Sequence, residues 1–189
     1  MKRGSLIIFV GPTGSGKTSL MKKLILEEKL RLLFIPTYTT RRQRINEIDG
    51  KDYFFLNEKD FLKLKEDDFF VETSFLNENY YGTSKETLNF LKNGKNVIKI
   101  LDSKGFIEWK KIYKNVYGIF IDINDKEIIS RIGFRNEKIE ENFLNERIEK
   151  GKEERKKLEI GIFDKYVFNS NFEKCFFEIR NFLEKILKN

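Results

Sequence analysis

The sequence predicts an α/β fold in which a parallel sheet lies between two layers of helices. Two observations predict it: short apolar strands alternate with amphipathic helices, and a glycine-rich turn joins the first strand to the first helix. Strand signals fall at residues 5–10, 97–101, 116–121 and 165–168, and helical signals at 17–29, 84–92, 125–133, 142–158 and 172–188. Open α/β sheets of this kind bind ligands at their carboxyl edge.

The glycine-rich turn follows the first apolar strand directly. It matches the G-x-x-x-x-G-K-[ST] pattern of a phosphate-binding loop, with a strand before it and a helix after it. The glycines allow backbone N–H groups to surround an anion, the lysine reaches the β- and γ-phosphates, and the last hydroxyl binds Mg²⁺. The sequence therefore predicts a P-loop NTPase sandwich whose ATP site includes Gly11, Pro12, Thr13, Gly14, Ser15, Gly16, Lys17 and Thr18.

Composition narrows the chemistry that this loop can serve. The 189 residues suit one domain with a sizeable core, and they include a single cysteine, Cys175, and no histidine. Imidazole catalysis, Ser-His-Asp hydrolysis and zinc sites built from His or several Cys are thereby excluded. Phosphoryl transfer to another phosphate passes this filter, because the acceptor is already an oxyanion that needs only positioning and charge neutralisation.

Charge and hydropathy favour small phosphorylated ligands. The net charge of +7 comes from basic residues interleaved with acidic ones, as in residues 150–157, which is typical of solvated helices. We therefore expect no nucleic-acid partner. The apolar stretch before Gly11 is too short for a signal peptide, and no run is long enough to cross a membrane. We expect a cytoplasmic monomer or homodimer with no membrane partner.

Residues 37–83 interrupt the alternation of strands and helices. They contain short aromatic strand signals at 53–56 and 69–73, with turns between them and no long helix. We interpret this segment as a small mixed subdomain that binds the acceptor. Residues 135–158 are polar and rich in arginine, as expected of a lid. The core of this single domain would then comprise residues 1–36, 84–134 and 159–189.

The same insertion carries four separated polar clusters. They read Thr37-Tyr-Thr-Thr-Arg-Arg-Gln-Arg44, Gly50-Lys-Asp-Tyr53, Phe70-Val-Glu72 and Asn79-Tyr-Tyr-Gly-Thr83. Together with the phosphate-binding loop and the later Phe163-Asp-Lys-Tyr-Val-Phe-Asn169, they resemble guanylate kinase in order and spacing through nearly the whole chain. The resemblance implies transfer of the ATP γ-phosphate to GMP, with dGMP as a further acceptor and Mg²⁺ as cofactor.

The resemblance also implies roles for individual residues. Two arginines and two tyrosines would bind the GMP phosphate, which combines guanidinium recognition with neutral donors. A glutamate would accept hydrogen bonds from guanine N1–H and the 2-amino group, and two threonine hydroxyls would lie near the base. The GMP site implied in this way consists of Thr37, Arg41, Arg44, Tyr53, Glu72, Tyr81, Thr83 and Asp102.

The resemblance is less complete on the donor side. Arg135 and Arg147 match the lid arginines of the family, one residue farther apart than usual, and Arg131 is a reserve candidate for the same catalytic role. Asn169 matches a residue near the adenine of ATP. The family commonly has two acids after its third core strand, whereas this chain has Ile100 in place of the first. Asp102 keeps the second, either facing the guanine site or helping Thr18 to bind Mg²⁺.

Three other functions compete with a guanylate kinase. A related kinase could phosphorylate a different nucleotide or a phosphorylated sugar, although Glu72 and the paired tyrosines favour GMP. A non-catalytic binding module of the same fold typically lacks an intact phosphate loop, whereas Lys17 and Thr18 are present here. A GTPase would need an Asn-Lys-x-Asp element, and the chain contains no such string.

Overall fold

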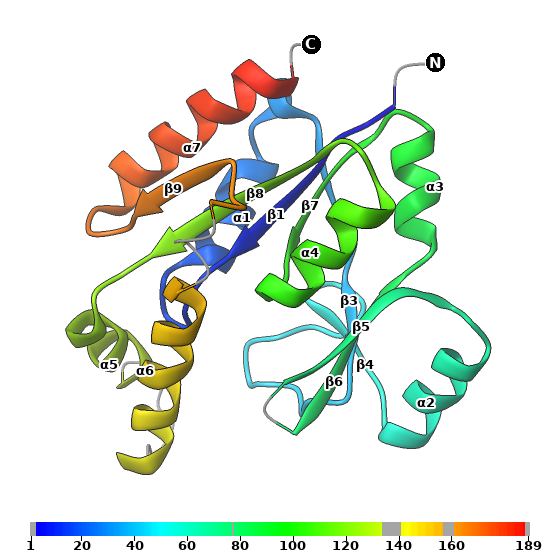
Figure 1. Ribbon diagram of the computed structural model, residues 1–189, viewed down its shortest axis with the longest axis horizontal. Coiled ribbons are helices and arrows are strands. Elements are labelled where there is room, and N and C mark those ends of the chain that lie inside the picture. The colour runs from blue at the N-terminus through cyan, green and yellow to red at the C-terminus, as the bar shows by residue number, and fades with distance from the viewer. Residues whose placement is uncertain (1–2, 77, 134–140, 157–160, 188–189) are drawn as a thin grey trace.

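The main sheet of the protein has five parallel strands in the order β2-β7-β1-β8-β9. They are β1 (Leu6–Val10), β2 (Leu32–Phe34), β7 (Asn96–Ile100), β8 (Val116–Asp122) and β9 (Lys165–Phe168). This is the arrangement in a computed structural model that describes residues 3–76, 78–133, 141–156 and 161–187. The predicted parallel sheet is confirmed, with its central strand carrying the phosphate-binding loop (Figure 1).

Helices cover both faces of this sheet (Figure 1). One face packs against α1 (Lys17–Ile25), the short 3-10 helix η1 (Glu28–Leu30) and α7 (Phe172–Leu187). The other face packs against α3 (Glu86–Lys92) and α4 (Ser103–Ile112). The three-layer sandwich predicted from the sequence is therefore confirmed.

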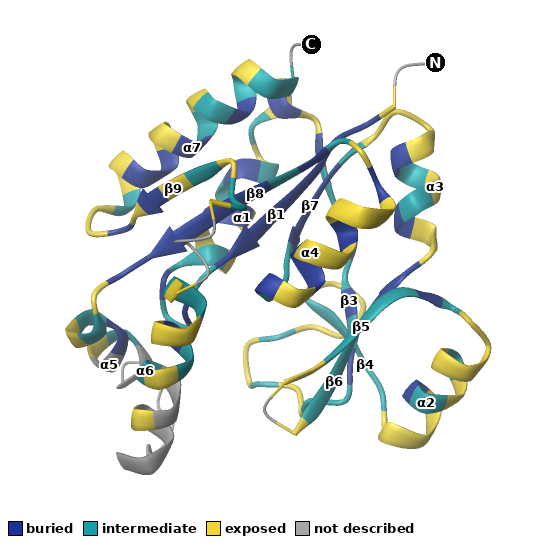
Figure 2. Ribbon diagram, viewed as in Figure 1, coloured by how far each residue is buried: buried dark blue, intermediate teal, exposed yellow. Residues whose placement is uncertain are grey.

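Burial on both faces explains why the core strands are almost continuously apolar. On β1, Ile7 and Phe9 face α1 and α7, while Leu6, Ile8 and Val10 face α3 and α4. Figure 2 shows the inner strands β7, β1 and β8 as largely buried and the outer sides of the helices as exposed. The cysteine of α7 lies in the first of these two cores, as expected for a small apolar filler.

A second, mixed sheet lies near the carboxyl ends of the main strands (Figure 1). Its order is β4-β3-β6-β5, from β3 (Thr37–Thr39), β4 (Tyr53–Phe55), β5 (Phe70–Leu76) and β6 (Asn79–Ser84). Stacked rings form its small core, with Phe61 and Phe70 at 4.7 Å and Tyr38 and Phe54 at 4.6 Å between centroids. This sheet occupies the segment in which the strand–helix alternation breaks.

Two helices contradict the sequence-based description. Residues 37–83 were expected to lack a long helix, yet α2 (Glu58–Glu66) spans nine residues there. The side chain of Asn57 caps it by accepting from the Asp60 N–H at 2.9 Å, and Phe61 is its buried anchor. Helix α4 was also missed, although Asp102 caps it by accepting from the Gly105 N–H at 2.7 Å. Helix α2 has a single buried residue, whereas α4 buries Phe106 and Trp109, three positions apart, a helical spacing in the sequence that was overlooked.

Two further helices extend beyond the carboxyl edge of β8, namely α5 (Asp125–Gly133) and α6 (Glu141–Lys156) (Figure 1). Helix α6 confirms the helical pattern expected at 142–158 as far as its last described residue. In the part of the chain that the structure describes, no helix is both long and apolar enough to cross a membrane.

Candidate functional site

A cavity of about 890 Å³ lies where the main sheet, the second sheet and α6 meet. Its walls come from the loop after β1, the end of β7, strands β3 to β6 and one side of α6. Eleven of the residues proposed from the sequence line it, and these are Gly11, Pro12, Thr13, Lys17, Thr37, Arg41, Arg44, Tyr53, Glu72, Tyr81 and Asp102. Donor and acceptor candidates therefore share one space.

The phosphate-binding loop depends on glycine at two points. Gly11 has φ +136°, and a Cβ there would lie 2.1 Å from the carbonyl oxygen of Ile121 on β8. Gly16 has φ +90° and precedes α1, so it offers that helix no side-chain cap. Because the first N–H groups of a helix lack intrahelical partners, an anion bound here would take the place of a cap.

Lys17 folds back over this loop. Its Nζ donates to the carbonyl oxygens of Gly11 and Pro12, both at 2.7 Å. The contacts hold the ammonium at the mouth of the loop, where the γ-phosphate of a bound nucleotide would lie. Thr18, the next residue, is exposed in the first turn of α1.

Asn169 supports the loop from behind. Its side chain is fully buried, and Nδ2 donates to the carbonyl oxygen of Ser15 at 2.7 Å. Arg131 donates to the carbonyl oxygen of Asn169 at 3.0 Å and to Glu127 at 2.8 Å. The reserve candidate Arg131 therefore lies beside the phosphate-binding loop.

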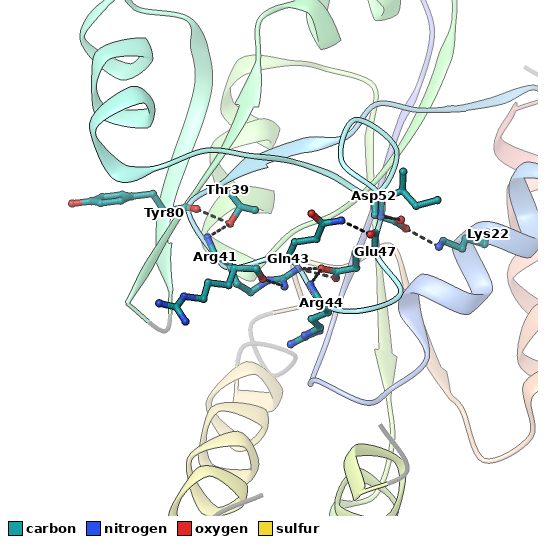
Figure 3. Close-up of polar contacts among 10 residues, drawn as sticks. Lys22, Thr39, Arg41, Gln43, Arg44, Glu47, Asp52 and Tyr80 are labelled. Atoms are coloured by element: carbon teal, nitrogen blue, oxygen red, sulfur yellow. Dashed lines mark hydrogen bonds and ion pairs between the residues drawn. The ribbon is translucent and has the colours of Figure 1, made fainter. Parts of the chain in front are cut away.

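The arginine loop, residues 40–50, is organised around Glu47 (Figure 3). Its carboxylate accepts from Arg41 Nη2 at 2.8 and 3.0 Å and from the Arg44 N–H at 3.0 Å. Burial opposes ionisation of Glu47, but these hydrogen bonds outweigh it and hold its pKa below the ordinary value. Glu47 thus fixes the Arg41 guanidinium and the backbone of Arg44 before any phosphate binds.

Two phenols complete this part of the cavity. The Arg41 guanidinium lies 5.1 Å from the centroid of the Tyr53 ring, and the Tyr53 and Tyr81 rings are 6.4 Å apart. Burial, together with the neighbouring Tyr81, raises the pKa of Tyr53, so this phenol stays a neutral donor. Two cationic and two neutral donors can therefore hold a phosphate dianion.

Glu72 lies on β5 and lines the same cavity. Its Oε1 accepts from the Thr83 hydroxyl of β6 at 2.7 Å. Burial raises the pKa of this carboxyl, and Asp102 raises it further, while Thr83 and Lys99 act in the opposite direction. Thr37, which is buried at the start of β3, lines the same cavity.

The end of β7 shows where the chain departs from the pattern of two acids. Ile100 packs against the core on the side of α1 and α7 and also lines the cavity. Asp102 reaches the cavity wall while one of its oxygens caps α4. Lys104, where the family usually has glutamine, is exposed on α4.

Helix α6 closes the remaining side of the cavity. Lys150, Gly151 and Glu154 line it, and Glu154 accepts a short hydrogen bond from the Ser103 hydroxyl. A Cβ at Gly151 would lie 3.2 Å from Pro12, so the helix passes close to the phosphate-binding loop. Farther along, Arg155 pairs with Asp122 at 2.8 Å.

Comparison with known proteins agrees with this geometry. A family model described as guanylate kinase matches residues 3–186. The chain belongs to the guanylate kinase family. The guanylate kinase of Mycoplasma mobile is 36% identical over 98% of this chain and 94% of its own length. That of Mycoplasma genitalium is 33% identical over 96% of this chain and 75% of its own.

The fold of the guanylate kinase family is also found in a solved relative. The crystal structure of guanylate kinase from Anaplasma phagocytophilum superposes with a TM-score of 0.78 and covers all of this chain and 89% of its own. At 20% identity, this likeness concerns the fold alone.

Two of the predicted site residues have side chains outside the described part of the structure. Arg135 falls outside the described residues, and Arg147 lies in α6 with its side chain outside the described part. The Thr83 hydroxyl donates to Glu72 and does not itself line the cavity. Sequence reasoning overlooked Lys99, although a lysine within the apolar run Val-Ile-Lys-Ile-Leu was a signal for it.

Proposed function

We propose that this protein transfers the γ-phosphate of ATP to GMP, giving ADP and GDP by direct displacement. The observation that carries the proposal is the shared cavity, which brings a phosphate-binding loop and a separate arginine–tyrosine cluster to one space. Because both ends of the reaction are phosphates, positioning and charge neutralisation can supply the catalysis without histidine. Membership of the guanylate kinase family and the names of the relatives favour GMP over another acceptor.

At the donor end, we assign ATP to the loop Gly11–Thr18. Lys17 would exchange its two backbone carbonyl partners for the β- and γ-phosphate oxygens. Asn169 would act by holding Ser15 and so the shape of the loop, near the adenosine end. Arg131 would stabilise charge on the transferring phosphate, with Arg135 and Arg147 of the lid as its companions, and its hydrogen bond to the carbonyl oxygen of Asn169 beside the loop supports this role.

At the acceptor end, we assign the GMP phosphate to Arg41, Arg44, Tyr53 and Tyr81. The base would pair with Glu72, because an ionised carboxylate accepts from both N1–H and the 2-amino group of guanine, which adenine lacks. Thr37 and Thr83 would add hydroxyls near the base, and Asp102 would face the same edge. A dianion held by two guanidinium groups keeps its nucleophilic oxygen directed toward the donor.

We assign Mg²⁺ to Thr18, and Asp102 is a second oxygen ligand in the alternative in which it does not face the guanine base. Within the described residues no group of three acidic, histidine or cysteine side chains could hold a metal. Hydroxyl and carboxylate oxygens nonetheless fit Mg²⁺, which usually binds one or two protein oxygens together with substrate phosphates. When bound, the metal would neutralise charge on the β- and γ-phosphate oxygens.

We propose that three parts of the domain perform separate tasks. Residues 1–36, 84–134 and 159–189 form the nucleotide-binding core, residues 37–83 bind GMP, and residues 135–158 act as a lid. The contact of Gly151 with Pro12 supports this division, because it brings the lid helix to the donor site. Exclusion of water there would limit hydrolysis of ATP.

The deciding experiment is an assay of ADP release by purified protein with Mg-ATP. GMP, dGMP, AMP, CMP, UMP and ribose phosphates are compared as acceptors. We expect rapid turnover with GMP and slower turnover with dGMP. Folded protein that releases ADP equally with every acceptor, or with another acceptor in preference to GMP, contradicts the proposal.

A further inference from the structure

Strand β7 carries a lysine in the interior of the protein. Lys99 is 0% exposed and lies on the face of the sheet covered by α3 and α4, beside Ile8 of β1. Its Nζ donates to the carbonyl oxygen of Ile35 at 2.8 Å. Ile35 belongs to the connection from β2 to β3, so the lysine crosses from the main sheet to the beginning of the second sheet.

A buried ammonium is costly unless an anion compensates it. Burial lowers the pKa of Lys99 to about 7, and Glu72 acts against that by favouring the charged form. Glu72 in turn is half-buried on β5. Its Oε2 lies 3.5 Å from the position that a Cβ on Gly105 would take, beside Leu101 and Asp102, so the carboxylate assigned to guanine lies against the residues that directly follow β7, on the side of α4 that Lys99 also faces.

The environment of Glu72 explains why a cation is needed there. Asp102, at the start of α4, disfavours a second negative charge, while Thr83 donates to Oε1 and Lys99 supplies positive charge. The indole N–H of Trp109 also favours the ionised form of Glu72, although it forms no hydrogen bond in this structure. The remaining charged side chains of the cavity wall are Lys17, Arg41, Arg44, Glu78, Lys150 and Glu154.

We propose that Lys99 is a positioning residue for base recognition, because its buried ammonium keeps Glu72 ionised and ready to accept two hydrogen bonds. A protonated Glu72 would present an O–H donor to guanine, whose N1–H and 2-amino group are themselves donors. The proposal rests on the role of Glu72 given under the proposed function. It adds a residue that touches no substrate and acts through the carboxylate.

The first experiment measures ionisation without nucleotide. Protein with ¹³C-labelled glutamate side chains is titrated by NMR, and the Glu72 signal is identified by its loss in Glu72→Gln. In Lys99→Met, which removes the charge but keeps most of the volume, we expect the Glu72 pKa to rise by about one pH unit or more. Lys104→Met, on the exposed side of α4, is the control. An unchanged Glu72 titration in Lys99→Met overturns the proposal.

The second experiment follows KM for GMP and for ATP between pH 5.5 and 8.5. We expect Lys99→Met to raise KM for GMP most at the acid end of this range, by up to about tenfold for each pH unit by which the Glu72 pKa rises. The difference should shrink above pH 7, because Lys99 loses its charge there in the wild type and Glu72 ionises in both proteins. A rise in both KM values that does not depend on pH would indicate a purely structural lysine.

A double-mutant cycle covers the case in which either single variant is poorly folded. Glu72→Gln leaves the buried ammonium without its anion, so adding Lys99→Met should raise the melting temperature of that variant and change KM for GMP less than twofold. If the stability losses of the two single variants add up in the double variant, Lys99 and Glu72 do not interact and the proposal is overturned. Melting and NMR titration need no catalysis, so these two measurements decide the role of Lys99 by themselves. If the wild type fails to phosphorylate GMP, that result counts against the proposed function and not against the role of Lys99.

Discussion

The donor and acceptor sides of the cavity are built on different principles. The donor loop is one continuous segment whose shape comes from backbone conformation, with Gly11 and Gly16 at positive φ. The acceptor side combines side chains from β3, β4, β5 and β6 with the arginine loop between them. A continuous loop carries its own geometry, whereas the acceptor site exists only when the second sheet has formed.

This difference predicts how each side responds to substitution. In the loop, one residue provides each essential contact, so a change should remove turnover or distort the loop as a whole. On the acceptor side, the phosphate and the base are each held by several groups, so a single change should give a graded loss that appears mainly in KM for GMP. The predictions below test this contrast, from the largest effect to the smallest.

Lys17→Met should have the largest effect on activity. Removal of one preorganised charge from a phosphoryl-transfer site lowers kcat on the order of 10²- to 10³-fold. Affinity for GMP, measured by calorimetry without ATP, should change less than twofold because the acceptor residues are separate. Lys29→Met, at an exposed position in η1, is the matched control. A parallel loss of GMP affinity in a folded variant would show that the two sides are not independent.

Gly11→Ala tests whether backbone conformation governs the loop. Its Cβ would lie 2.1 Å from the Ile121 carbonyl oxygen, at a φ that alanine rarely adopts. We expect about 2–4 kcal/mol of lost stability in urea unfolding and weakened ATP binding. Gly161→Ala, also at positive φ but with no described atom within 4 Å of the Cβ position, should cost about 1 kcal/mol. Equal losses would assign the effect to strain rather than to the contact with β8.

The same contrast explains what the sequence could predict. The donor loop, the parallel sheet and most helices follow from local patterns, and the structure confirms them. Helix α4 escaped because its cap, Asp102, was interpreted as a ligand, and α2 because a single phenylalanine anchors it. Lys99 has a local signal, since it stands within an apolar strand, but its nearness to Glu72 depends on β5 folding against α4, a tertiary contact between distant segments.

Glu72→Gln should change the choice of base rather than the donor site. Hydrogen bonds to charged groups contribute about 1.5–3 kcal/mol, so KM for GMP should rise roughly 10- to 100-fold. The glutamine amide would also place an N–H₂ donor opposite the N1–H and 2-amino donors of guanine. We therefore expect a smaller preference of the enzyme for GMP over AMP. Glu66→Gln, at the exposed end of α2, is the control. An unchanged ratio of GMP to AMP turnover would remove Glu72 from base recognition.

The smallest effect is expected for Glu47→Gln, which loosens the arginine loop without touching a phosphate. The side chains of Arg41 and Glu47 are 16% and 17% exposed, so the pair is largely shielded from solvent. The glutamine amide oxygen can still accept one hydrogen bond from Arg41, so the loss should be about 1 kcal/mol at pH 7. The folded-state pKa of Glu47 is lowered, so this contribution is complete above its ordinary pKa and is lost as the pH falls through the lowered value. Urea unfolding of wild type and variant should therefore differ at pH 7 and converge as the pH falls below about 4.

The KM of the Glu47→Gln variant for GMP should rise only a few-fold, because Arg44, Tyr53 and Tyr81 remain. A loss as large as that of Lys17→Met would mean that the acceptor side, like the donor loop, depends on one residue.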